Sequence, residues 1–160
     1  MISPEVCRIS KHNLNSVHLI LSDQILKKIQ LLLIVGKMKS GKTQLLKILH
    51  SKYKDGPLIN LGLKLSKKFV ECVGIDFYEA MDEILGNHSK VYLDNLEILT
   101  DPYLNRDSIR ELVKLSRKRK VVATLIGEVR DNIVYYQRNM RCELNNLNNS
   151  FVIHIVEEDV

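Results

Sequence analysis

One stretch of the chain has the residue types and spacing of a phosphate-binding loop. Residues 36–43 read GKMKSGKT and match the pattern G-x-x-x-x-G-K-[ST] at every fixed position. In such a loop the glycines allow backbone N–H groups to turn inward, and the start of the following helix adds partial positive charge. The stretch therefore predicts a site for the phosphates of a nucleoside triphosphate.

The side chains of this loop have expected roles. Lys42 is expected to reach the β- and γ-phosphates as a point charge, and the Thr43 hydroxyl to ligate Mg²⁺. The other expected nucleotide contacts are Gly36, Lys39, Ser40, Gly41 and Gln44. The base-reading pattern N-K-x-D does not occur in the sequence, so ATP is favoured over GTP.

A second Mg²⁺ ligand is expected at the end of the apolar stretch KVYLD, where Asp94 follows four residues of strand-like sequence. Magnesium keeps several waters and takes few protein ligands, so one carboxylate beside the loop is enough. Asp94 is therefore the candidate Walker B aspartate, with an ordinary surface aspartate as the alternative.

Hydrolysis also needs a group that orients or deprotonates the attacking water. Asn95 follows Asp94 directly, at the position where AAA+ proteins commonly carry a catalytic glutamate. Glu97 could substitute only if the chain bends after Asp94, and is otherwise a surface charge. Thr124 matches a polar "sensor 1" position that contacts the γ-phosphate or the water, with a buried strand threonine as the alternative.

Charge that develops on the γ-phosphate is often neutralised by an arginine from a neighbouring subunit. The candidates for such an arginine finger are Arg138, Arg141 and Arg117. No C-terminal helical lid is expected after the last predicted strand, so a single subunit is expected to be a slow ATPase.

Strand-like and helix-like stretches alternate along the chain. Strands are predicted at Gln30–Gly36, Pro57–Asn60, Val91–Asp94, Val121–Leu125 and Phe151–Val156. Helices are predicted at Thr43–Tyr53, Leu63–Val73, 76–86 and Asp107–Lys118. This alternation predicts a three-layer α/β fold with a parallel five-stranded sheet. The extra strand between the loop and Asp94 favours the AAA+/RecA-like (ASCE) class of P-loop NTPases over small-molecule kinases.

The length of 160 residues and the apolar content of 45% suit a single domain, residues 1–160. Residues 1–29 are expected to form one or two helices that pack on the core. Ser3-Pro4-Glu5 resembles a helix start, and Val17, Leu21 and Ile25 recur at four-residue spacing.

Composition limits where the protein works and what it binds. The apolar run Leu31–Val35 is far shorter than the roughly 20 residues of a membrane span, and no secretion signal is evident. Three scattered cysteines suit a reducing cytoplasm. The net charge of +5 permits an anionic partner, so the basic run Lys114–Lys120 could contact DNA or could be a solvated helix end.

Several stretches together resemble BrxF, the small P-loop protein family of one type of bacteriophage exclusion (BREX) system. These stretches are LIVGKMKSGKTQLLKIL, PLINLGLKLSKKFVE, VYLDNLEILTDP and LSRKRKVVATLIG, within residues 31–127. The resemblance implies a cytoplasmic ATP-binding component of a multi-protein system that methylates host DNA and blocks phage replication. It transfers roles only to Gly36–Thr43 and Asp94.

Three functions remain open on sequence grounds. The first is an ATPase or ATP switch that assembles, depending on nucleotide, with itself and with other defence-system proteins. The second is a non-hydrolysing ATP-dependent scaffold, since Asn95 replaces the usual glutamate. The third is a small-molecule kinase with Arg130, Arg138 and Arg141 as lid residues.

Overall fold

A computed structural model of the protein describes residues 4–158. These residues form an eight-stranded sheet with helices on both faces. The strands are β1 Glu5–Ser10, β2 Leu31–Gly36, β3 Leu58–Asn60, β4 Lys90–Asp94, β5 Lys120–Arg130, β6 Ile133–Tyr136, β7 Met140–Glu143 and β8 Ser150–Val156. The helices are α1 Val17–Ile20, α2 Asp23–Lys28, α3 Lys42–Tyr53, α4 Leu61–Glu71, α5 Phe77–Leu85 and α6 Ser108–Ser116. Short 3-10 helices are η1 Leu14–Ser16, η2 Leu96–Thr100 and η3 Leu144–Asn146.

Most of the sheet is parallel. Its strands lie in the order β1-β8-β2-β5-β4-β3, and every pairing in this series is parallel. Strand β5 lies between β2 and β4, so the strand that ends in Asp94 is not the neighbour of the strand that leads into the loop. Beyond this region β5 pairs antiparallel with β6, and β6 with β7.

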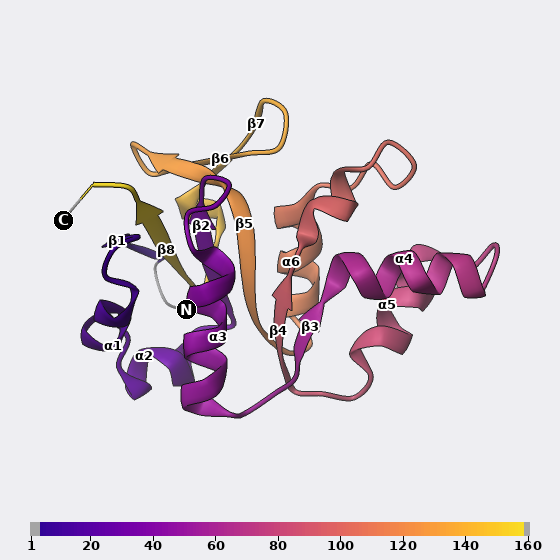
Figure 1. Ribbon diagram of the computed structural model, residues 1–160, viewed down its shortest axis with the longest axis horizontal. Coiled ribbons are helices and arrows are strands. Elements are labelled where there is room, and N and C mark those ends of the chain that lie inside the picture. Colours follow the sequence, from indigo (N-terminus) through magenta and orange to yellow (C-terminus); the bar gives the residue numbers. More distant parts are fainter. Residues whose placement is uncertain (1–3, 159–160) are drawn as a thin grey trace.

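The two faces of the sheet are covered by different helices, as three layers require. Alternate residues of β2 point to opposite faces: Leu33 and Val35 pack with side chains of α4, α5 and α6, whereas Leu32 and Ile34 pack with α3 and the N-terminal helices. Because all six residues of β2 are buried, its sequence reads as a continuous apolar run. Helix α3 lies in front of β2 in Figure 1, and the β6–β7 hairpin lies beyond the ends of β2 and β5.

The five predicted strands are present, but the prediction of a five-stranded sheet is wrong because three strands were missed. β5 does not end at Leu125 but continues to Arg130, where it forms a hairpin with β6. The turn between them contains Asp131 and Asn132, both with positive φ, and the next turn contains Asn139 with φ 58°. Aspartate and asparagine tolerate this conformation, which explains why the chain can reverse twice without glycine.

The predicted helical N-terminus is wrong for its first part. Ser3 lies outside the described residues, and Glu5–Ser10 is an edge strand that pairs with β8 along its whole length. Val6 packs on one face of the sheet and Ile9 on the other, which is the period of a strand and not of a helix. The helices that follow do pack on the core as predicted, with Val17 and Leu21 buried.

Side-chain caps fix the first residues of several helices. Three of the caps are Asn60 on α4, Asp76 on α5 and Asp107 on α6, each accepting a backbone N–H from the first turn, and Ser22 caps α2 in the same way. Among residues 4–158, no helix has the length and apolar content needed to cross a membrane.

Candidate functional site

The loop between β2 and α3 has the backbone shape that its sequence predicts. Gly41 has φ 98°, and a β-carbon there would lie 3.1 Å from Leu14 Cδ1, so both conformation and space favour glycine. Gly36 is the last residue of β2, and a β-carbon there would overlap the Ser40 hydroxyl. The two glycines therefore let the loop close tightly over the end of the strand.

Lys42 lies inside this loop and not on its surface, because its side chain is only 9% exposed. Its ammonium donates a hydrogen bond to the Lys37 carbonyl oxygen at 2.6 Å and lies 3.5 Å from Ser40 Oγ. Burial lowers the pKa of Lys42, and the negative charges of Glu97 and Asp94 offset part of this shift. The loop thus holds a poorly solvated cation, which an incoming anion would stabilise.

Asp94 joins three segments that are far apart in the sequence. Its Oδ2 accepts a hydrogen bond from the Thr43 hydroxyl at 2.8 Å, at the start of α3. Its Oδ1 accepts from the Thr124 hydroxyl on β5 at 2.6 Å and from the Asn95 backbone N–H at 3.0 Å. The carboxylate is 8% exposed and is therefore held in one orientation beside the loop.

The chain bends sharply after Asp94. Asn95 has φ 58° and ψ 59°, the left-handed conformation that asparagine tolerates better than most residues, and the 3-10 helix η2 follows at once. Because of this bend Glu97 lines the same pocket as the loop instead of continuing along β4. The condition that sequence analysis set for Glu97 to act at this site is met.

The loop, Asp94 and η2 enclose a pocket of about 570 Å³. The predicted residues that line it are Lys39, Ser40, Gly41, Lys42, Thr43, Gln44, Asp94, Asn95 and Glu97. Two predicted residues do not line it: Gly36 shapes the loop from behind, and Thr124 acts through Asp94. Met38, Lys47 and Ile126 also line the pocket and are not predicted from the sequence. Lys47 could have been found, since it lies four residues after Thr43 on the same face of α3.

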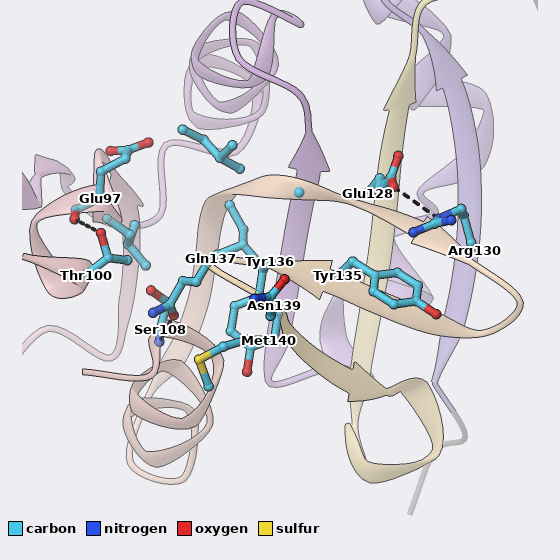
Figure 2. A pocket seen from close by; sticks show the side chains of 14 residues that line it. Glu97, Thr100, Ser108, Glu128, Arg130, Tyr135, Tyr136, Gln137, Asn139 and Met140 are labelled. Carbon is cyan, nitrogen blue, oxygen red and sulfur yellow. Dashed lines mark hydrogen bonds and ion pairs between the residues drawn. The ribbon is translucent and has the colours of Figure 1, made fainter. Parts of the chain in front are cut away.

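A second pocket of about 510 Å³ adjoins the first and shares Glu97 and Ile126 with it. Figure 2 shows Glu97 and Thr100 on one side of this pocket and the Glu128–Arg130 ion pair on the other. The floor and walls are largely apolar or aromatic and come from η2, β5 and β6. Glu97 is thus placed between the loop and a space that could hold another molecule.

The predicted finger arginines lie away from the loop of their own chain. Arg138 is exposed in the turn between β6 and β7, Arg141 lies on β7, and Arg117 follows α6. No arginine is among the residues found to line the loop pocket within the described part of the chain.

The donors beside the loop suit magnesium better than a metal that needs a full protein cage. Within residues 4–158 no group of three or more His, Cys, Asp or Glu side chains is arranged to hold a metal ion. One hydroxyl and one carboxylate, from Thr43 and Asp94, lie in contact at the pocket edge. Hard oxygen ligands in this small number are what Mg²⁺ takes when phosphates and water supply the rest.

Replacing Asn95 by valine should destabilise the fold, whereas glycine should be tolerated. A β-branched residue in the left-handed conformation costs about 1–2 kcal/mol, and glycine adopts it freely. We expect urea unfolding to show a loss of about that size for Asn95→Val and a change within about 0.5 kcal/mol for Asn95→Gly. Asn145→Val, at an exposed position without positive φ, is the matched control. Equal losses for both valine variants would show that the bend is not under conformational constraint.

Comparisons with known proteins give little beyond this geometry. No protein-family model matches the sequence, and no curated protein matches it. Among solved structures, the chain is similar to PCH-2 of C. elegans, with 17% sequence identity and a TM-score of 0.39. The similarity covers 90% of this chain but only 40% of the PCH-2 chain. A similarity this distant says nothing about activity.

Proposed function

We propose that this protein is a Mg²⁺-dependent ATP-binding P-loop NTPase of the AAA+/RecA-like (ASCE) class. The observation that carries the proposal is the convergence of Thr43, Thr124 and Asp94 beside the loop, through hydrogen bonds of 2.8 and 2.6 Å. Thr43 and Asp94 would hold the metal, whose chemistry is to neutralise charge on the β- and γ-phosphates. The phosphates would lie on the loop, with Lys42 and the N-terminal N–H groups of α3 as donors.

The strand order supports the class. Strand β5 separates β2 from β4, so the carboxylate that faces the loop comes from a strand one place further along the sheet. On sequence grounds the class is favoured by an extra strand, residues 57–60, between the loop and Asp94 along the chain. That strand, β3, lies on the far side of β4, and the intervening strand is β5.

Hydrolysis is proposed to depend on Glu97. Glu97 lines the pocket and is close enough to Lys42 to influence that residue's pKa, which supports a position near the outermost phosphate that Lys42 would bind. A carboxylate there can orient a water molecule and accept its proton. Asn95, next to Asp94, forms the bend that brings Glu97 to this place. Glu97, and not Asn95, would then act as the general base.

Replacing Glu97 by glutamine should separate binding from turnover. Loss of a general base lowers the rate of the chemical step by about 10²–10⁴-fold, whereas the phosphate donors of the loop remain. We expect ATP affinity within about threefold of wild type and release of phosphate at least about 100-fold slower. Labelled ATP turnover and isothermal titration measure the two quantities. Glu79→Gln, an exposed carboxylate on α5, is the matched control.

The same experiment distinguishes the alternatives. If wild type and Glu97→Gln release phosphate equally slowly while both bind ATP tightly, the protein is an ATP-dependent scaffold. If the label moves to an added hydroxyl compound in place of water, the adjoining pocket is an acceptor site and the protein is a small-molecule kinase. The position of Glu97 between two pockets is the observation that keeps this second function in view.

No arginine within residues 4–158 lines the loop pocket, which supports a requirement for assembly. We propose that a second copy of the chain supplies that cation through Arg138, Arg141 or Arg117, or that a different partner protein supplies it. Mass determination with and without Mg-ATP tests this: a nucleotide-dependent dimer or ring is expected. A chain that stays monomeric at saturating Mg-ATP and still hydrolyses it rapidly would contradict the proposal.

A role in an anti-phage defence complex is the furthest step of the proposal and is supported by the BrxF resemblance alone. The nucleotide site does not depend on this step. Co-purification of the chain with other proteins encoded beside its gene, in the presence of Mg-ATP, would test it. A chain that neither binds such proteins nor alters phage growth would leave the ATPase without this role.

A further inference from the structure

A groove of about 580 Å³ runs between α6 and strand β7, on the face of the sheet opposite α3. Three arginines line it: Arg110 and Arg117 from α6 and Arg141 from β7. Arg110 and Arg117 are seven residues apart, which places them on one side of the helix about 10 Å apart along its axis. An arginine finger would use at most one of Arg117 and Arg141, and it gives no role to the three arginines together in one groove.

These three guanidinium groups have no partner within residues 4–158. All three residues are exposed, and their side chains form no hydrogen bond, ion pair or ring contact with any described residue. Two other basic residues on or beside α6 already have partners. Lys114 donates to the Tyr78 hydroxyl at 2.8 Å, and Arg119 caps the end of α5 through the carbonyls of Leu85, Gly86 and His88.

The walls of the groove are fixed to each other. The Tyr136 hydroxyl donates to Asp107 at 2.7 Å, which ties β6 to the start of α6. The Gln137 side chain accepts from the Ser108 N–H at 2.8 Å and donates to the Arg106 carbonyl at 3.1 Å. The hairpin and the helix therefore present their arginines at a set separation before any ligand arrives, which reduces the entropy lost on binding.

The groove suits a phosphate backbone better than a protein surface. None of the exposed large apolar side chains of residues 4–158 lines it, so an interface would lack the apolar anchors on which protein partners depend. Its one aromatic residue, Tyr136, is buried and offers no ring for unpaired bases to stack on. Its carboxylates are Asp107, which is already hydrogen-bonded, and Glu143, which is exposed.

We propose that this α6–β7 groove binds the sugar-phosphate backbone of double-stranded nucleic acid without sequence preference. Arg110 and Arg117, about 10 Å apart along the helix axis, can contact two different phosphates of one strand. Arg141 contacts the backbone from the opposite wall. Guanidinium groups suit this role because their planar fork matches two phosphate oxygens at once.

The test is fluorescence anisotropy with a labelled 20-base-pair DNA duplex of arbitrary sequence, without nucleotide, across a series of salt concentrations. Each lost phosphate contact should lower the slope of log affinity against log salt by about 0.9. The Arg117→Ala/Arg141→Ala variant should therefore bind at least about tenfold more weakly at low salt, with a slope smaller by about two. The conservative Arg117→Lys/Arg141→Lys variant should keep the slope and lose less affinity.

The matched control is Arg8→Ala/Lys64→Ala, which removes the same two charges from exposed positions outside the groove. It should bind the duplex as wild type does, with unchanged slope. Equal losses in groove and control variants would overturn the proposal, since net charge alone would then explain binding. Tighter binding of a single strand than of the duplex, or equal competition by polyglutamate, would overturn it as well. Because no ATP is present, failure of the nucleotide site would not affect the result.

Discussion

Asp94→Asn is expected to remove the Mg²⁺ dependence of ATP binding and to lower turnover by at least about 100-fold, while the protein still folds. Asparagine has the same shape, and its amide oxygen can still accept from Thr124 and from the Asn95 N–H, the two partners of Asp94 Oδ1. The amide nitrogen would face the Thr43 hydroxyl, which can rotate to accept. The hydrogen bonds survive, and only the negative charge is lost.

Thermal unfolding with ATP, with and without Mg²⁺, measures this effect. A ligand that binds only the native state stabilises it more the more tightly it binds. Wild type should therefore be stabilised more by Mg-ATP than by ATP alone, because Asp94 would hold the metal. Asp94→Asn should show the same small shift in both conditions. Asp101→Asn, an exposed aspartate just after η2, makes the same chemical change outside the pocket. A variant that keeps the full Mg²⁺ response would show that Asp94 is not a metal ligand.

The parts of the fold that sequence patterns predicted are those whose burial leaves a local trace. β2 and β8 are buried almost throughout, so each reads as an unbroken apolar run. The helices carry caps such as Asp76 and Asp107, which act within one turn and are visible in the sequence.

The missed strands depend on distant partners. β1 contains Glu5 and Arg8 among its six residues and is stable as a strand only because β8 lies beside it. The β6–β7 hairpin is short and half-exposed, and its turns lack the glycines that usually mark hairpins. Tertiary contacts decide such segments, and a local pattern does not contain them.

The site was predictable in its types of residue but not in its geometry. The spacing of Gly36, Gly41 and Lys42 describes a loop on its own, whereas the role of Glu97 depends on the left-handed bend at Asn95. In the basic run Lys114–Lys120, the sequence suggests more charges free to bind a partner than the fold leaves available. Lys120 donates to two carbonyls at the end of α2, so a charge that sequence alone offers to DNA is used inside the fold.

Lys42→Met is expected to weaken ATP binding by at least about 100-fold without destabilising the nucleotide-free protein. The substitution removes the one buried ammonium that faces the loop, where hydrogen bonds to charged groups contribute about 1.5–3 kcal/mol each. In the absence of nucleotide that ammonium is poorly solvated, which is why burial lowers its pKa. The Lys37 carbonyl also accepts the Ser40 N–H at 3.1 Å, so no buried acceptor is orphaned.

The pH dependence has a defined sign. Because the folded pKa of Lys42 lies below that of an unfolded lysine, holding the charged form costs folding free energy at neutral pH. This cost falls as pH rises above the folded pKa and is gone above the pKa of the unfolded lysine. At pH 7 the unfolding free energy of Lys42→Met should therefore equal or exceed that of wild type, and wild type should approach it in alkaline solution. Urea unfolding at pH 7 and in alkaline solution measures the difference in unfolding free energy between wild type and Lys42→Met. Lys52→Met, at the exposed end of α3, is the control. A loss of more than about 1 kcal/mol at pH 7, as for an ordinary core defect, would show that Lys42 is there for the fold and not for a phosphate.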